Sequence, residues 1–287
     1  MKAPKVIAEI GCNHKGQMEI AEEMIMMIAK FCKADYAKFQ KRNPKEVLTP
    51  EQYNMPHPVE ANSYGTTYGE HREFLEFDLD QHKQLKAWCE EQGIGYSTSV
   101  WDLTSAEEIT SLNPDFIKIP SGTNQHYEVL NYLCEQFAGD IHVSVGMTTH
   151  EEERKLIDFF KERGRNKSLV LYSCTSGYPV PFEDIGLYEI TRLIENYGDE
   201  VKQIGFSGHH LGIAADIAAM TLGAEWVERH FTLDRTWKGT DHAASLEPEG
   251  MRKLVRDLRN VSKALNYKES EILEIEKPQR DKLKWGI

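Results

Sequence analysis

Residues 203–232 read QIGFSGHHLGIAADIAAMTLGAEWVERHFT, and this stretch decides the fold. Two short β-rich runs, at 203–209 and 226–232, enclose an amphipathic segment at 212–222 whose apolar residues follow helical spacing. A strand, a helix and a second strand in such close succession predict a right-handed βαβ unit with parallel strands.

The same unit recurs outward from this stretch. Further β-rich runs lie at 5–11, 36–40, 95–100, 115–121, 141–147 and 168–175. Segments with helical spacing lie at 18–32, 81–91, 105–112, 127–137, 151–163, 183–197 and 249–265. Strands that alternate with single helices over eight units favour closure into a barrel over an open doubly wound sheet. No GxGxxG motif follows the first run, where a dinucleotide-binding fold would need one. We therefore expect an α/β fold, a single-domain (β/α)₈ TIM barrel.

The barrel should span residues 1–266 and carry one long irregular loop at 43–76, rich in Pro, Gly, Asn and Tyr. Long loops after barrel strands usually shape the mouth of a substrate site. The charged tail at 267–287 is expected to lie on the barrel surface rather than to form a second domain.

Composition limits the partners of this chain. Its formal net charge of −12 repels nucleic acid and anionic membranes, so neither is expected to bind. No segment approaches the roughly 18 apolar residues of a membrane span, and the first residues show no signal-peptide pattern. Five scattered cysteines without a CxxC pair argue against a disulfide framework. We expect a cytoplasmic protein.

Polar side chains gather at the carboxyl ends of the predicted strands, the end at which barrels carry their active sites. They include Glu9, Lys38, Gln40, Thr98, Lys118, Ser121, Ser144, Ser207, His209, Glu228 and His230. Each alone is compatible with a core ion pair or a helix cap. Together they predict a site for an anion and a metal, because burying unpaired charge is costly.

His209 and His230 end adjacent predicted strands, so both imidazoles can reach one ion. With Gln40, Glu9 or water as oxygen donors, the set suits Mn²⁺, Co²⁺, Fe²⁺ or Mg²⁺ better than structural zinc.

Lys38 and Lys118, with nearby hydroxyls, supply the donors that a phosphate and a carboxylate require. This pattern is typical of a phosphoenolpyruvate site. A buried lysine can also form a Schiff base, so a class I aldolase remains an alternative.

The chain resembles the sialic acid (N-acetylneuraminate or nonulosonate) synthases, which are phosphoenolpyruvate-condensing TIM barrels. The resemblance rests on AEIGCNHKG (8–16), AKFQ (37–40), YSTSV (96–100), IKIPSG (117–122), SVGM (144–147), YSCTSGYPVP (172–181), GFSGHH (205–210) and ERHFTLDRTWKGTDHAASLEP (228–248). The last block is the most specific of these motifs.

The resemblance implies a condensation of phosphoenolpyruvate with an open-chain aldose, with loss of phosphate by C–O cleavage. It implies a divalent metal, Mn²⁺ before Mg²⁺ or Co²⁺, at His209, His230 and Gln40. It implies phosphoenolpyruvate contacts from Lys38, Thr98, Lys118, Ser121, Ser144 and Ser207. Sugar contacts would come from Glu9, Ser176, Tyr178 and Asp241, and catalytic roles would fall to Glu9, Lys118, Asp241 and His242.

Three departures from the family pattern concern the sugar. Thr123 stands where a glutamate is usual, so acid–base chemistry would pass to Glu9, Asp241, His242 or a metal-bound water. Ser176 stands where asparagine is common. An antifreeze-like C-terminal domain that typical bacterial members carry is expected to be lacking.

These departures favour mannose or mannose 6-phosphate over N-acetylmannosamine as the acceptor, giving deaminoneuraminate (KDN) or its 9-phosphate. Candidates for binding a distal phosphate are Lys15, Arg72, Arg235 and Lys238. A Schiff-base aldolase or lyase and a non-catalytic barrel subunit remain alternatives, and a homo-oligomer is expected.

Overall fold

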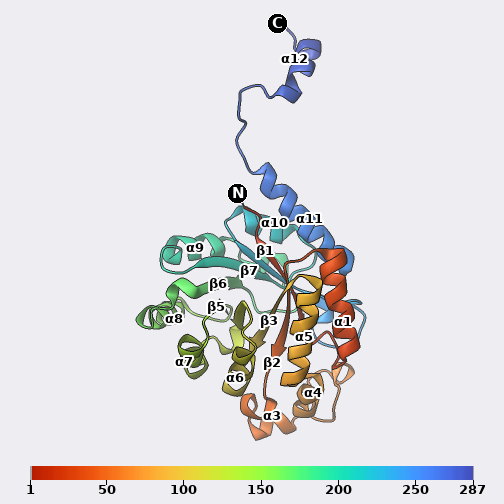
Figure 1. Cartoon of the computed structure of the whole chain (residues 1–287), viewed down its shortest axis with the longest axis vertical. Coiled ribbons are helices and arrows are strands. Elements are labelled where there is room, and N and C mark those ends of the chain that lie inside the picture. Colours follow the sequence, from red (N-terminus) through yellow and green to blue (C-terminus); the bar gives the residue numbers. More distant parts are fainter. Residues whose placement is uncertain (1, 287) are drawn as a thin grey trace.

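The structure is a computed structural model that describes residues 2–286. Eight parallel strands close into a barrel in sequence order, each pairing with the next and the last with the first (Figure 1). The strands are β1 (Lys5–Gly11), β2 (Tyr36–Lys41), β3 (Gly95–Val100), β4 (Phe116–Ile119), β5 (Asp140–Ser144), β6 (Leu169–Cys174), β7 (Gln203–Gly208) and β8 (Trp226–His230). The predicted TIM barrel is confirmed.

The helices surround the barrel and follow the predicted segments closely. They are α1 (Met18–Met26), α5 (Leu79–Gln92), α6 (Leu103–Ser111), α7 (Tyr127–Gln136), α8 (His150–Glu162), α9 (Tyr188–Tyr197), α10 (Ala214–Thr221) and α11 (Pro248–Ala264). α1 continues into a π-helical turn, Met27–Cys32, and α9 begins later than predicted, after a 3₁₀ turn at Phe182–Asp184. Within residues 2–286, no helix has both the length and the apolar character needed to cross a membrane.

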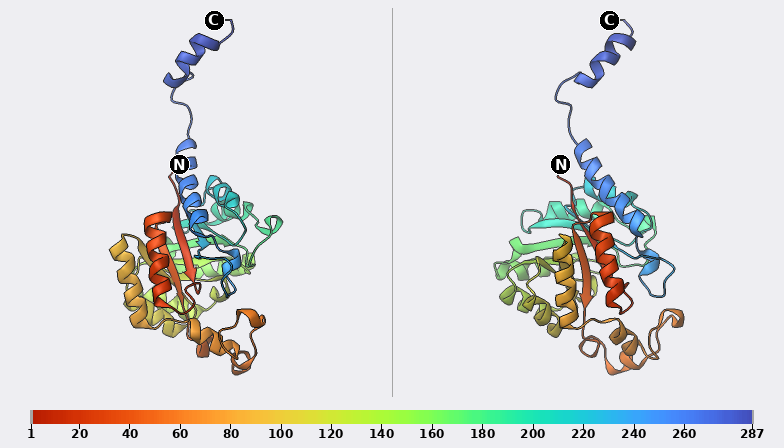
Figure 2. Two further views of the ribbon diagram at one scale, coloured as in Figure 1. Left: turned by 90° about the vertical axis from the view of Figure 1, so that its right-hand side faces the viewer. Right: turned by 45° about the vertical axis from the view of Figure 1, so that its right-hand side comes forward.

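The segment at 43–76 is not the irregular loop that we expected. It contains three short helices, α2 (Pro44–Val47), α3 (Pro50–Asn54) and α4 (Tyr68–Leu75). Thr49 and Thr67 each begin a helix with a capping box, in which the hydroxyl accepts from the third helical residue. The T-x-x-Q and T-x-x-E patterns were the signal for these helices. Figure 2 shows this segment at one end of the barrel.

The amino end of the barrel interior is filled with apolar side chains, so the site lies at the carboxyl end. Side chains on successive strand residues alternate between the helix layer and the barrel interior. In the interior, apolar residues form a plug at the amino ends of the strands, comprising Ile7, Phe116, Val170, Tyr172 and Trp226. His142 stacks on Phe116 with ring centroids 3.9 Å apart and contacts the Tyr172 hydroxyl through Nδ1. The plug closes the amino end of the barrel interior, and the cavity lined by Glu9, Lys38 and Lys118 lies toward the carboxyl ends.

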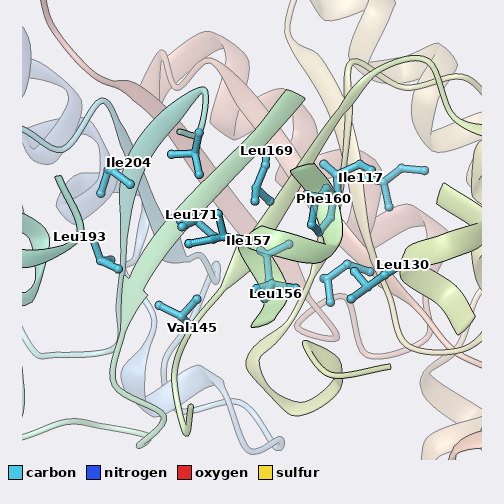
Figure 3. Packing of buried hydrophobic residues seen from close by; sticks show 14 of the residues in the cluster. Ile117, Leu130, Val145, Leu156, Ile157, Phe160, Leu169, Leu171, Leu193 and Ile204 are labelled. Carbon is cyan, nitrogen blue, oxygen red and sulfur yellow. The ribbon is translucent and has the colours of Figure 1, made fainter. Parts of the chain in front are cut away.

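The largest apolar cluster lies between the strands and helices α6 to α9. Figure 3 shows Leu156, Ile157 and Phe160 of α8 packed among strand residues such as Leu169 and Leu171. These side chains are fully buried.

The tail does not lie on the barrel surface as predicted. After α11 the chain extends away, and α12 (Lys277–Leu283) stands clear of the barrel, at the end opposite the 43–76 segment (Figures 1 and 2). The tail exposes Ile275, Leu283 and Trp285 to solvent. The tail is rich in charged residues, which water solvates readily.

We expect Phe160→Ala to lower the free energy of unfolding by about 3–5 kcal/mol, because it leaves a cavity among well-packed apolar side chains. Urea unfolding measures the change. Tyr267→Ala is the control, since this ring is 98% exposed, and it should change stability by less than about 0.5 kcal/mol. Equal unfolding midpoints for the two variants would contradict the packing described above.

Candidate functional site

A cavity of about 420 Å³ opens at the carboxyl ends of the strands. Most of the predicted site residues line it: Glu9, Lys38, Gln40, Lys118, Ser121, Ser144, Ser176, Tyr178, Ser207, His209, His230 and Asp241. Lining residues to which the sequence analysis gave no site role are Arg42, Ser99, Trp101, Pro120, Gly122, Met147, Cys174 and Thr240. The barrel thus brings together side chains from all parts of the chain.

The floor of the cavity is a buried group of four charged side chains, which we call the floor quartet: Glu9, Lys38, Lys118 and Glu228. Lys38 Nζ lies 2.5 Å from Glu9 Oε2 and 3.7 Å from Glu228 Oε1. Lys118 Nζ lies 3.0 Å from Glu228 Oε2 and 3.6 Å from the centre of the Tyr172 ring. The quartet therefore rests directly on the apolar plug.

The two carboxyl groups of the quartet have opposite pKa shifts. Burial raises the pKa of Glu9 from 4.5 to about 8, although Lys38 opposes the shift. Burial also disfavours the charged form of Glu228, but Lys118 and Lys38 outweigh it and lower its pKa to about 2. Two neighbouring carboxyl groups with such different pKa values can take different roles, one as a fixed negative charge and the other as a proton donor or acceptor. Glu228 remains ionised, and Glu9 can exchange a proton near neutral pH.

The lysines respond to the same surroundings. Burial lowers the pKa of Lys118. Burial also opposes the charged form of Lys38, but Glu228 and Glu9 outweigh it and raise its pKa. Lys38 is thus the more firmly charged of the two ammonium groups.

Thr98 does not reach the cavity, and this prediction is corrected. Its hydroxyl donates to the Tyr96 hydroxyl at 2.6 Å, on the side of β3 that faces the helices. The next residue, Ser99, faces the cavity and accepts a hydrogen bond from Lys38 Nζ at 2.7 Å. Lys38 and Gln40 face the barrel interior and pair with Ser97 and Ser99 of β3. Because side chains alternate along a strand, Ser99 faces the interior and Thr98 does not.

His209 and His230 come together at the wall of the cavity, with ring centroids 5.4 Å apart. Burial and the nearby His230 lower the pKa of His209 to about 3, and burial lowers that of His230, so both rings are neutral. His209 Nδ1 contacts the Thr175 carbonyl at 3.0 Å, which leaves Nε2 for another partner. His230 Nδ1 is buried, and no hydrogen-bond partner for it lies among the described residues.

These features fit a divalent metal ion, because a metal ligand must be a neutral imidazole with a free ring nitrogen. Among residues 2–286, however, no three His, Cys, Asp or Glu side chains form a metal-binding group by themselves. The two imidazoles would therefore need oxygen donors from Gln40, substrate or water. Gln40 Nε2 contacts Cys12 Sγ, which leaves the amide oxygen of Gln40 for this purpose.

Asp241 faces the cavity, whereas the neighbouring His242 points away from it. Asp241 lines the cavity, and although burial disfavours its charge, His230 and Arg72 hold its pKa below the usual value. His242 contacts the Thr232 hydroxyl through Nδ1 at 2.8 Å and does not line the cavity. The 3₁₀ turn that begins at His242 directs the two neighbours apart. The structure therefore does not support the direct catalytic contact that we predicted for His242.

Of the four cations predicted to bind a distal phosphate, only Arg72 lines the cavity. Lys15 lies over the Trp237 ring and Lys238 over the Tyr64 ring, at 4.3 and 4.9 Å from their centres. The guanidinium of Arg235 donates to the Ala243 carbonyl.

Arg72 is held by Tyr68, whose hydroxyl accepts from Arg72 Nε at 2.9 Å. Within the described part of the chain, no carboxylate forms an ion pair with Arg72. The other arginine at the mouth, Arg42, is paired with Glu76 at 2.5 Å. Arg72 is therefore the cation at the mouth whose charge is available to an anion.

Thr123 lies beside the cavity rather than in its wall. With Ser121, Gly122 and Met147 it lines a shallower adjoining depression. Its hydroxyl is buried, and no hydrogen-bond partner for it occurs within residues 2–286. The carboxylate expected at this position in similar proteins therefore has no counterpart here.

Comparison with known proteins gives a consistent result. The family model described as the NeuB family matches residues 24–270. N-acetylneuraminate-9-phosphate synthase of Homo sapiens is 38% identical over 278 residues, covering 97% of this chain and 76% of the human protein. N,N'-diacetyllegionaminic acid synthase of Campylobacter jejuni is 31% identical, covering 92% of this chain and 78% of its own length.

Among solved structures, the N-acetylneuraminic acid synthetase of Leptospira borgpetersenii, crystallised with citrate, superimposes with a TM-score of 0.81 and 26% identity. The match covers 99% of this chain and 93% of that one.

The raised pKa of Glu9 predicts that stability falls as pH rises. The folded state keeps a proton that the unfolded state loses above its ordinary pKa of 4.5, so stability is lost progressively up to about pH 8. The glutamine of the Glu9→Gln variant does not titrate. We therefore expect the unfolding free energy of wild type minus that of Glu9→Gln to fall across this window. Urea unfolding with chelator present measures it, and a difference that stays constant with pH would contradict the assignment.

Proposed function

The chain belongs to the NeuB family, and we propose that it condenses phosphoenolpyruvate with a 6-phosphorylated aldose to make a nonulosonic acid 9-phosphate and inorganic phosphate. The enzyme class, a transferase that joins phosphoenolpyruvate to a sugar, follows from the relatives named above. The identity of the sugar and of the metal are proposals specific to this chain.

The observation that carries the proposal is the arrangement of cations around one cavity. Lys38 and Lys118 lie at its floor beside the hydroxyls of Ser99, Ser144 and Ser207. Ammonium groups and short hydroxyls are the donors that the phosphate and carboxylate of phosphoenolpyruvate require. With Glu9 protonated, the floor quartet carries one net positive charge, which favours an anion.

The reaction joins C3 of phosphoenolpyruvate to the aldehyde carbon of the sugar, after which water adds at C2 and phosphate leaves. We assign Glu9 as the group that donates a proton to the aldehyde oxygen as the bond forms. Its raised pKa and its place at the cavity floor support this role. Asp241 remains ionised and is placed to accept hydrogen bonds from sugar hydroxyls.

A divalent metal, with Mn²⁺ as first choice, would be held by His209, His230 and the amide oxygen of Gln40. It would polarise the aldehyde oxygen as a Lewis acid. With no carboxylate at Thr123, Glu9 and Asp241 are the acidic groups that remain for proton handling and sugar orientation.

The acceptor is proposed to be phosphorylated at C6 because Arg72 offers an unpaired guanidinium at the cavity mouth. Phosphoenolpyruvate adds three carbons at C1 of the sugar, so C6 becomes C9 of the product. The human relative is by name a synthase of a 9-phosphate. Mannose 6-phosphate and N-acetylmannosamine 6-phosphate both satisfy this chemistry, and an assay separates them.

We also propose that the protein is cytoplasmic and forms homo-oligomers. All five cysteines are free thiols in the structure, which suits a reducing compartment. Sedimentation of the purified chain measures its oligomeric state directly.

The test of the function is phosphate release from phosphoenolpyruvate with Mn²⁺, using mannose, N-acetylmannosamine and the 6-phosphate of each. We expect turnover with a 6-phosphate, its loss with chelator, and its return when Mn²⁺ is added in excess. Condensation of pyruvate with the sugar, together with borohydride trapping of Lys118 or Lys38 in the presence of pyruvate, would instead favour a Schiff-base aldolase. No turnover with any acceptor would favour a non-catalytic barrel.

Replacing Arg72 tests the choice of acceptor. Arg72→Met should raise KM for the 6-phosphorylated sugar by about 10- to 100-fold, the effect of losing a charge-assisted hydrogen bond. KM for phosphoenolpyruvate should change little. Arg235→Met is the matched control, because this exposed arginine does not line the cavity. Equal losses with phosphorylated and free sugars would sink the assignment of Arg72 to the phosphate.

A further inference from the structure

Arg229 is a buried charge that the proposed chemistry does not use. It lies on β8 between Glu228 and His230, and it is only 1% exposed. Both neighbours line the cavity, so strand alternation directs Arg229 to the other side, toward α10. Burying a guanidinium is costly unless a carboxylate pairs with it, as Asp216 does here, and only its Nε has no hydrogen-bond partner within residues 2–286.

The partners of the Arg229 side chain found among residues 2–286 belong to one short segment of chain. Arg229 Nη1 donates to Asp216 Oδ2 at 2.5 Å and to the Gly212 carbonyl at 2.9 Å. Arg229 Nη2 donates to the His210 carbonyl at 2.5 Å, and Nη1 lies 3.0 Å from His210 Nε2. These acceptors occupy the connection from the end of β7 into α10.

This connection begins with His209. The backbone of His209 is also fastened from the other side, because the Val180 amide donates to its carbonyl at 3.1 Å. Arg229 itself pairs with Gly208 in the register of β7 and β8. One guanidinium therefore ties the segment that carries His209 to the strand that carries His230.

We propose that Arg229 is a positioning residue that holds His209 and His230 at the separation and orientation required by one shared metal ion. The inference rests on the metal site proposed above. The planar fork of arginine is essential to it, because several carbonyl and carboxylate acceptors are engaged at fixed angles. A lysine can reach one or two of them but cannot hold the whole segment.

The test is Mn²⁺ binding to the whole protein by calorimetry, without substrate. Arg229→Lys should raise the Kd for Mn²⁺ by about tenfold or more, the effect of removing a residue that orients metal ligands. The Mn²⁺ concentration that gives half-maximal turnover should rise by the same factor.

The matched control is Arg192→Lys. Arg192 makes a bidentate, partly buried pair, with both Glu153 oxygens at 2.8 Å, but on helices α9 and α8 and away from the cavity. It should lower stability without changing the Kd for Mn²⁺. This separates a positioning effect from a general loss of stability.

If Arg229→Lys folds poorly, the double variant Arg229→Met with Asp216→Leu removes both charges and leaves neither unpaired. It should show the same loss of Mn²⁺ affinity. Wild-type affinity in either folded variant would overturn the role of Arg229 while leaving the metal site intact. Failure of the wild-type protein to bind Mn²⁺ would overturn the metal site and this inference with it.

Discussion

The buried floor quartet is the constraint on which the rest of the site depends. Two lysines and two glutamates lie inside a barrel whose interior, at the amino ends of the strands, is filled by aliphatic and aromatic side chains. Charges in such surroundings are tolerated only when each has a partner. The pairing fixes which group keeps its charge, and this in turn makes Glu9 the group that titrates near neutral pH.

The same balance of charge governs what the cavity can accept. The quartet carries only one net positive charge when Glu9 is protonated, and Arg42 is neutralised by Glu76. A substrate pair that carries a phosphate, a carboxylate and a second phosphate needs positive charge from elsewhere. Arg72 at the mouth and a metal ion beside His209 and His230 are the sources that the geometry offers. The choice of substrate therefore depends on which cations at the cavity are unpaired. It does not depend on the net charge of the whole chain, which is −12.

Much of the site was predictable from the sequence because strand ends are recognisable locally and barrels gather them at one end. His209, His230, Lys38, Lys118 and Glu9 were predicted in this way, and all five line the cavity. Thr98 was chosen over Ser99 because motif reading ignored which face of β3 each side chain occupies. His242 was chosen beside Asp241 because adjacency in sequence says nothing about a turn that sends the two apart.

The sequence by itself determined the alternation of strands and helices, and hence the barrel, because periodicity of apolar residues is a local property. It also determined which chemical groups are available at the rim. Only the tertiary structure decided which of them are free to bind a ligand, since a cation is neutralised by whatever folds against it. Arg42 forms an ion pair with Glu76, and Arg229 forms one with Asp216. Arg72 donates to the Tyr68 hydroxyl and forms no ion pair within residues 2–286. The position of the tail, which stands clear of the barrel, was likewise visible only in the tertiary structure.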